Sequence, residues 1–310
     1  MIKTDKERLE YLNKELNTNY TSLKVVNWED ISIYHKLTEE FIREFHDKVD
    51  WYWISAYQNL SEDIIRYFAD KVNWKRNISR TQKLSEKFIR EFADKLDWYN
   101  ISYYQTLSED FIREFKDNVN WVYISRTQIL SEKFIREFQD KVDWGYISEC
   151  QILSEDFIRE FTDKVDWDGI SIYQTLSENF IREFQDKLDW VKISANQTLS
   201  EYFIREFQDK VDWGYISECQ ILSEDFICVF SEKVNWDWIS TKQTLSEEFI
   251  REFKEYVNWE CISEHQKLSN DFLREFKDKI NWNSFFCRED VQAILVDKII
   301  NKELNLNETN

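Results

Sequence analysis

Hydrophobic and polar positions recur along most of this chain in a pattern 23 residues long. A clear copy, residues 130–152, reads Leu-Ser-Glu-Lys-Phe-Ile-Arg-Glu-Phe-Gln-Asp-Lys-Val-Asp-Trp-Gly-Tyr-Ile-Ser-Glu-Cys-Gln-Ile. The copies are marked by tryptophans at positions 28, 51, 74, 98, 121, 144, 167, 190, 213, 236, 259 and 282. Every step is 23 residues except Trp74 to Trp98, which is 24. A period in this range indicates a repeat architecture.

The first half of each copy predicts a helix, here called helix A, over about residues 131–141. Ser131 is a good N-cap because its hydroxyl accepts a hydrogen bond from a free first-turn N–H. Phe134, Ile135 and Phe138 fall on one apolar face of this helix. Acid-before-base pairs four residues apart are expected on the other face: Glu132 with Arg136, and Glu137 with Lys141.

The second half predicts a helix B over about residues 143–151, with Asp143 as the N-cap. From this cap the residues Trp144, Ile147, Ser148 and Gln151 fall on one stripe, which we expect to be buried. Buried serine and glutamine side chains need hydrogen-bond partners. We therefore predict that each glutamine bonds to the adjacent repeat and that these bonds form a ladder along the stack.

Two short helices per copy predict an all-α fold, an α-solenoid of about eleven 23-residue two-helix repeats with capping helices at both ends. The apolar spacing of three and four residues excludes the leucine-rich repeat, whose strands need a spacing of two. The expected parts are an N-terminal capping helix in 1–24, the solenoid in 25–282, and a C-terminal capping helix and tail in 283–310. The one-residue insertion in 74–79 predicts a π-type bulge or a longer cap, and with it a local irregularity or slight kink.

The composition limits the partners and the location of the protein. The net charge is −19 and the pI is about 4.7, which opposes direct binding to the phosphate backbone of a nucleic acid. No apolar run approaches the length of a membrane span, and the first residues do not resemble a secretion signal. Five cysteines without a C-x-x-C pair predict reduced thiols. These features favour a cytoplasmic protein with no membrane partner.

The sequence contains no motif of a known kind of catalytic or cofactor site. Its three histidines do not form a metal-spaced pair, and its three glycines cannot build a phosphate-binding loop. The many carboxylates recur in every copy beside basic residues, which is typical of a solvated face. We therefore expect no enzymatic activity, no metal and no cofactor.

The copies differ most on helix B, at the positions two and six residues after the repeat tryptophan. These two positions lie four residues apart on one ridge of the helix. Aromatic side chains are common there: Tyr34, Trp53, Tyr57, Tyr104, Tyr123, Tyr146, Tyr173, Tyr215 and Trp238. Exposed aromatic clusters often carry binding energy, so these residues are candidates for a partner-binding surface. The alternative is that the rings lean over the grooves between repeats and cover the core.

The repeat L-S-E-x-F-I-R-E-F-x-D-K-V-D-W-x-x-I-S-x-x-Q resembles tandem-repeat proteins of giant viruses of amoebae, the mimivirus group. The likeness covers roughly residues 25–282. It implies a viral origin and a location in the host cytoplasm, and it carries over no functional residues.

The leading hypothesis for the function is a non-enzymatic scaffold that binds a protein partner along one face, because elongated repeat surfaces suit that role. The alternatives are a structural or virion-associated component and an acidic mimic of nucleic acid.

Overall fold

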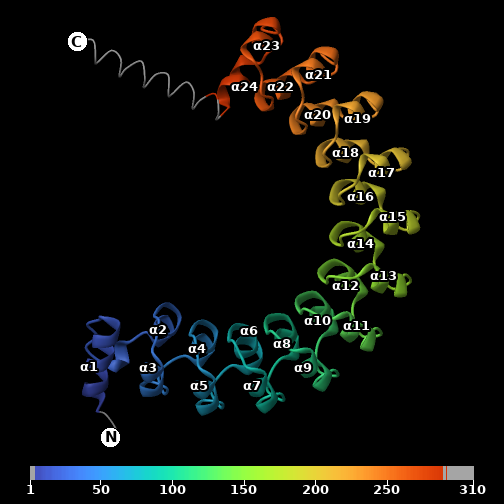
Figure 1. Ribbon diagram of the computed structural model, residues 1–310. Coiled ribbons are helices and arrows are strands. Elements are labelled where there is room, and N and C mark those ends of the chain that lie inside the picture. The colour runs from blue at the N-terminus through green and yellow to red at the C-terminus, as the bar shows by residue number, and fades with distance from the viewer. Residues whose placement is uncertain (1–3, 289–290, 292–310) are drawn as a thin grey trace, which may run out of the picture. The chain divides into compact units, whose positions relative to one another are not determined.

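The computed structural model describes residues 4–288 and residue 291, and helices are the only regular secondary structure in these residues (Figure 1). The helices recur in pairs with the period of the sequence, which confirms the all-α, helical-repeat fold. The chain divides into two units, residues 1–151 and 152–310, and each is described by itself.

The first unit begins with α1 (Asp5–Leu16) and the short turn η1 (Leu23–Val25). Its B helices form one row in Figure 1: α2 (Trp28–Tyr34), α4 (Trp51–Tyr57), the segment η2 (Trp74–Ile78) with α6 (Ser79–Thr81), α8 (Trp98–Tyr104), α10 (Trp121–Thr127) and α12 (Trp144–Cys150). Its A helices form the other row: α3 (Glu39–Glu44), α5 (Glu62–Tyr67), α7 (Glu86–Glu91), α9 (Glu109–Glu114) and α11 (Glu132–Glu137).

The second unit repeats the same two rows. Its A helices are α13 (Glu155–Glu160), α15 (Glu178–Glu183), α17 (Glu201–Glu206), α19 (Glu224–Val229), α21 (Glu247–Glu252) and α23 (Asn270–Glu275). Its B helices are α14 (Trp167–Tyr173), α16 (Trp190–Asn196), α18 (Trp213–Cys219), α20 (Trp236–Lys242), α22 (Trp259–His265) and α24 (Trp282–Cys287). Within each unit, successive B helices pack against one another.

The caps that the sequence predicts set the beginnings of both helices. Ser131 Oγ accepts the N–H of Phe134 at 3.2 Å, and Asp143 Oδ1 accepts the N–H of Tyr146 at 3.1 Å. Helix B therefore has the predicted extent, with Asp143 and Gln151 as its two caps. The core lies between the rows, where Phe134, Ile135 and Ile147 are fully buried.

Helix A is shorter than the sequence analysis expected, because it ends at Glu137 instead of continuing to Lys141. Phe138 leaves the helical conformation (φ −114°, ψ 28°), and a tight turn follows in which the Lys141 N–H bonds to the Phe138 carbonyl at 2.8 Å. Glu132 and Arg136 do form the expected pair, at 3.6 Å. The predicted pairing of Glu137 with Lys141 is wrong, because the helix that would align them has ended.

Both residues pair instead with the preceding repeat. Glu137 accepts a hydrogen bond from Arg113 at 2.8 Å, and Lys141 lies 3.0 Å from Asp117. The second charge pair of each repeat thus joins neighbours.

The N-terminal helix α1 substitutes for a preceding A helix. Thr4 caps it and forms a capping box with Glu7. Leu12 is fully buried, and Tyr11 stacks on Phe45 with ring centroids 6.2 Å apart. Arg8 lies over the Phe45 ring and binds Asp47, much as the A-helix arginines bind the following repeat. This arrangement agrees with the predicted N-terminal capping helix.

The extra residue between Trp74 and Ile78 is absorbed as one turn of π-helix, which is the first of the two expected alternatives. The Ile78 N–H bonds to the Asn73 carbonyl five residues earlier at 2.9 Å, and Ser79 Oγ bonds to the Trp74 carbonyl at 2.8 Å. Ser79 and Gln82 therefore return to the same buried positions as in other repeats. The predicted C-terminal capping helix and tail in 283–310 lie outside the described residues, except for 283–288 and residue 291.

Candidate partner-binding surface

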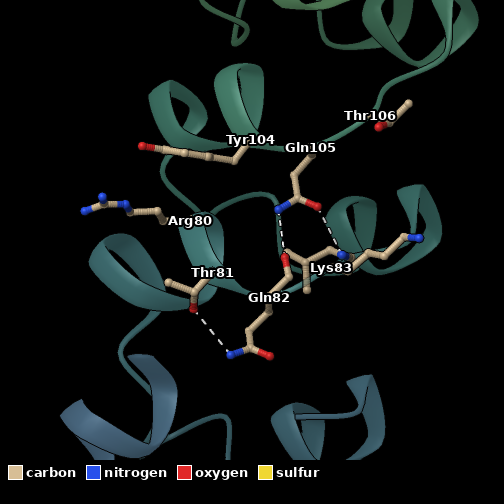
Figure 2. Close-up of a pocket in the computed structure, with 8 residues that line it drawn as sticks. Arg80, Thr81, Gln82, Lys83, Tyr104, Gln105 and Thr106 are labelled. Carbon is tan, nitrogen blue, oxygen red and sulfur yellow. Dashed lines mark hydrogen bonds between the residues drawn. The ribbon is translucent and has the colours of Figure 1, made fainter. Parts of the chain in front are cut away.

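A glutamine side chain joins each repeat to the one before it, as the sequence predicts. Gln105 Nε2 donates to the carbonyls of Ser79 at 3.3 Å and Gln82 at 2.8 Å. Its Oε1 accepts the N–H of Leu84 at 3.0 Å (Figure 2). The same three bonds recur for Gln58 and Gln128 in the first unit, and for Gln220, Gln243 and Gln266 in the second. The glutamine amide thus binds the backbone of the extended linker that joins helix B to the next helix A.

The buried serine of helix B forms a second link between repeats. Ser102 Oγ donates to the Trp98 carbonyl at 2.7 Å and accepts the N–H of Asn120, the N-cap of the next B helix, at 2.8 Å. Ser102 is fully buried. Its hydroxyl therefore has both a donor and an acceptor role, and the start of each B helix is held by the helix before it.

The repeat tryptophans from Trp28 to Trp259 are half-buried and Trp282 is exposed, whereas the sequence predicts a buried stripe. The indole N–H of Trp121 donates to the Lys116 carbonyl, at the end of the preceding helix A, at 2.9 Å. One face of the ring packs against Phe138 of the following helix A at 4.9 Å, and Lys141 lies over the ring at 6.0 Å. The ring thus lies at the edge of the core, where its polar atom reaches a backbone carbonyl.

A third series of bonds follows the A helices. The glutamate that begins an A helix accepts the backbone N–H of the next A-helix cap in most repeats, for example Glu86 from Ser108 at 2.6 Å. The arginine later in the helix reaches the next repeat: Arg90 Nε bonds to Glu114 at 2.7 Å, and its guanidinium lies over the Phe111 ring. Most charges of helix A are therefore used between repeats.

The structure separates the nine candidate aromatic residues by position. The four that lie six residues after the tryptophan are exposed: Tyr34 by 78%, Tyr57 by 60%, Tyr104 by 45% and Tyr173 by 55%. Each comes directly before the glutamine, or before His35 in the first repeat, at the C-terminal end of helix B. Tyr215, two residues after its tryptophan, is also exposed, by 40%.

The other four candidates are half-buried and lean on neighbours: Trp53, Tyr123, Tyr146 and Trp238. The indole N–H of Trp53 donates to Glu29 of the preceding repeat at 3.2 Å. The Tyr123 ring packs against Tyr99 at 4.7 Å, and its hydroxyl bonds to the Tyr99 hydroxyl, which raises the Tyr123 pKa. The rings of Trp53 and Tyr123 therefore pack against the preceding repeat.

Hollows lie between the C-terminal ends of successive B helices. One of about 430 Å³ is lined by Ile33–Leu37 and Tyr57–Asn59. A second of about 290 Å³ is lined by Arg80–Leu84 and Tyr104–Thr106. Figure 2 shows Gln105 in the middle of this second hollow, with Arg80 and Lys83 on opposite sides of it. The equivalent hollow in the second unit, about 270 Å³, is lined by Thr241–Leu245 and His265–Lys267.

Three exposed isoleucines, which are not among the residues predicted from the sequence, follow the glutamine directly. Ile129, Ile152 and Ile221 are 97%, 97% and 95% exposed. A comparison between copies could have identified them, because the other repeats have lysine, asparagine or threonine at this position. They lie in the extended linker beside the end of helix B.

The structure has five free thiols: Cys150, Cys219, Cys228, Cys261 and Cys287. Partial burial and the neighbouring Glu149 carboxylate raise the pKa of Cys150, so this thiol is a weak nucleophile.

Within residues 4–288 no group of histidine, cysteine and acidic side chains is arranged to hold a metal ion. Among the helices that the structure describes, none is both long enough and apolar enough to cross a membrane.

Comparison of the chain with protein-family models, with curated proteins and with solved structures found no match.

Proposed function

We propose that this protein is a non-enzymatic scaffold that binds a protein partner along the C-terminal ends of its B helices. The observation that carries the proposal is the exposure of Tyr34, Tyr57 and Tyr104 beside the hollows between B-helix ends. Tyr173 is exposed at the same position of its repeat. Tyrosine provides a large, rigid contact area with a polar tip, and it is enriched among residues that dominate binding energy. We infer a cytoplasmic protein, and a location in the host cytoplasm if its origin is viral.

The recurring polar side chains of the repeat are bound to neighbouring repeats, which favours a scaffold over an enzyme. The buried serine hydroxyl and glutamine amide make structural bonds in both directions, as Ser102 and Gln105 do. The A-helix arginines, such as Arg90, are held by carboxylates of the following repeat. Groups held in this way contribute to the stability of the stack.

A nucleic-acid mimic is the second candidate, because exposed carboxylates recur at a regular spacing. Asp186 and Asp209, 23 residues apart, are 88% and 89% exposed. Each, however, lies 3.1 Å from a lysine of the following repeat, Lys210 or Lys233. A basic partner would have to displace these lysines, so we favour the scaffold.

The test compares two double variants as bait for affinity purification from cells that express the protein. Tyr34→Ala with Tyr57→Ala removes rings that are 78% and 60% exposed at the ends of B helices. Tyr67→Ala with Tyr202→Ala removes rings that are 67% and 74% exposed on A helices. A partner that binds as proposed is retained by the second variant and lost by the first, with helical content unchanged in both. Equal retention by the two variants would refute the proposed surface.

Particle composition separates the scaffold from a virion component. If the protein is a major constituent of purified particles by mass spectrometry and no partner is lost from the Tyr34→Ala, Tyr57→Ala variant, the structural alternative replaces our proposal.

A further inference from the structure

The last positions of the B helices have few acidic residues, although the chain as a whole is strongly acidic. At the position of Arg80 and Arg126, two residues before the glutamine, three other repeats have an acid: Glu149, Glu218 and Glu264. The sequence has 60 aspartates and glutamates against 41 lysines and arginines. In all eleven repeats from Trp28 to Trp259, the residue before the glutamine position, the residue at it and the residue after it are never acidic. The three hollows contain lysine, arginine or histidine and no carboxylate in their linings.

Cations gather at these ends in the first unit: Lys36, Arg80, Lys83 and Arg126. All four are exposed, and none of them forms an ion pair with a carboxylate in the described part of the chain. Arg80 lies 5.5 Å over the Tyr104 ring, and Arg126 lies 5.3 Å over Tyr146. By contrast, the A-helix arginines Arg66, Arg90 and Arg113 each bond to a glutamate of the following repeat. This face therefore offers positive charge that the protein does not itself neutralise.

The helix dipole alone does not account for the absence of acids. The negative C-terminal end of a helix disfavours carboxylates, but the A helices of this protein end in glutamate, as α7, α9 and α11 do. Those glutamates have arginine partners. The ends of the B helices from α2 to α10 have cations that no carboxylate pairs with, and the one acid at an equivalent position in the first unit is Glu149 on α12.

We propose that the B-helix ends of the first unit bind an extended, acidic segment of a protein partner. This inference rests on the proposed partner-binding function and deepens it. Carboxylates of the segment pair with Lys36, Arg80, Lys83 and Arg126, and its apolar parts lie against the exposed rings of Tyr34, Tyr57 and Tyr104. Complementary charge of this kind guides association and selects the partner.

The length of the segment follows from the spacing of the hollows. The two hollows of the first unit are two repeats apart, and packed helices lie about 8–10 Å from one another. An extended chain covers about 3.3 Å per residue, so about six residues separate side chains that enter the two hollows. A segment of about twelve residues therefore reaches all four cations.

The test measures fluorescence anisotropy of a labelled 12-residue peptide of alternating glutamate and glycine with the full chain at low salt. The variant K36E/R80E/K83E/R126E reverses the four cations. The matched variant K75E/K87E/K116E/K133E reverses four lysines that are equally exposed and lie elsewhere, so that both variants change the net charge alike. We expect saturable binding that the first variant weakens by about tenfold or more and the second by less than about threefold. A second form of the first variant, with glutamine at the four positions, keeps the test valid if charge reversal disturbs folding.

Three outcomes would overturn the inference. They are no binding of the glutamate peptide by the wild-type chain, equal weakening by the two matched variants, and tighter binding of a 12-nucleotide oligouridylate or of a lysine–glycine peptide. The glutamate peptide could fail to bind while the Tyr34→Ala, Tyr57→Ala variant still loses a partner. That result would reject an acidic segment as the ligand and would leave the proposed partner-binding function supported.

Discussion

Helix B has two regions that follow different rules, its packed side and its C-terminal end. The packed side carries a serine and a glutamine that hardly change from repeat to repeat, and their bonds to the neighbouring backbone recur in both units. The C-terminal end carries tyrosine, cysteine, lysine, histidine, threonine or asparagine before the glutamine. The packed side is constrained because buried backbone groups need partners. The end is free to vary because water can solvate whatever lies there.

Two stretches of identical sequence show that the contacts of the packed side depend only on neighbouring repeats. Residues 134–158 and 203–227 have the same sequence. Gln151 and Gln220, at the same place in the two stretches, both bond to a serine and a glutamine carbonyl of the repeat before them. The repeat thus carries within itself the groups that dock it on its neighbour, so repeats can be duplicated without new contacts.

Among the changes that test this difference between the two regions of helix B, Gln105→Ala should lower the free energy of unfolding most. The substitution removes three hydrogen bonds and leaves two carbonyls and one N–H of the buried linker without partners. At about 1–3 kcal/mol for each unsatisfied group, the free energy of unfolding should fall by about 3 kcal/mol or more. Urea unfolding followed by tryptophan fluorescence measures it. Thr106→Ala, one residue further and exposed, should change it by less than about 0.5 kcal/mol. Similar losses of unfolding free energy in both variants would contradict the difference between the packed side and the C-terminal end of helix B.

Ser102→Ala should have the next largest effect. It leaves the N–H of Asn120 without its acceptor at the start of the next B helix. The expected loss in unfolding free energy is about 1–2 kcal/mol, again from urea unfolding. Thr198→Ala, a hydroxyl lost from an exposed position, is the control and should be nearly neutral. If Ser102→Ala left the free energy of unfolding unchanged, the hydrogen bond from Asn120 to Ser102 would contribute nothing to the stability of the stack.

Deleting Arg76 should have a small effect, because it restores the common 23-residue spacing. The remaining Trp-Lys-Asn-Ile-Ser has the form of Trp98–Ser102, in which Asn100 bonds to the Lys75 carbonyl at 3.1 Å. We expect a change in unfolding free energy within about 1 kcal/mol, and no loss of helix by circular dichroism. Deleting Tyr99 from the regular repeat should cost several times more, because it moves Ser102 and Gln105 off their partners. Equal effects of the two deletions would contradict this account of the π-turn.

The smallest effect concerns pH. The N–H of Ser269 donates to Glu247 at 2.6 Å, and this bond lowers the pKa of Glu247 below its usual value near 4.5. A carboxylate whose folded pKa is depressed stabilises the fold fully above its unfolded pKa, and the stabilisation disappears as the pH falls through the folded pKa. The stability difference between wild type and Glu247→Gln should therefore be largest near neutral pH and shrink below about pH 4.5. A difference that is constant from pH 6 to pH 3 would contradict it.

The sequence by itself determined the helices and where most of them begin. Serine before an acidic residue and aspartate or asparagine before tryptophan are local capping signals, and the structure has caps at Ser131 and Asp143. The period also predicted that Gln105 and its equivalents bind the adjacent repeat. For the insertion near Trp74 it left a π-type bulge and a longer cap open, and the structure has the π-turn. These features depend on residues close in sequence, or on a pattern repeated so regularly that any two neighbours meet in the same way.

Only the tertiary structure decided the end of helix A, the partners of the glutamine and the exposure of the aromatic rings. Helix A ends at Glu137 because Phe138 turns out of the helix, with its ring packed between Phe134 and Trp121. The sequence places Tyr57 and Trp53 on one ridge and predicts the same exposure for both. In the structure Tyr57 is exposed, whereas the Trp53 indole N–H donates to Glu29 of the preceding repeat. The distance between neighbouring helices decides whether a side chain reaches the next repeat or the solvent, and that distance is set by packing between repeats.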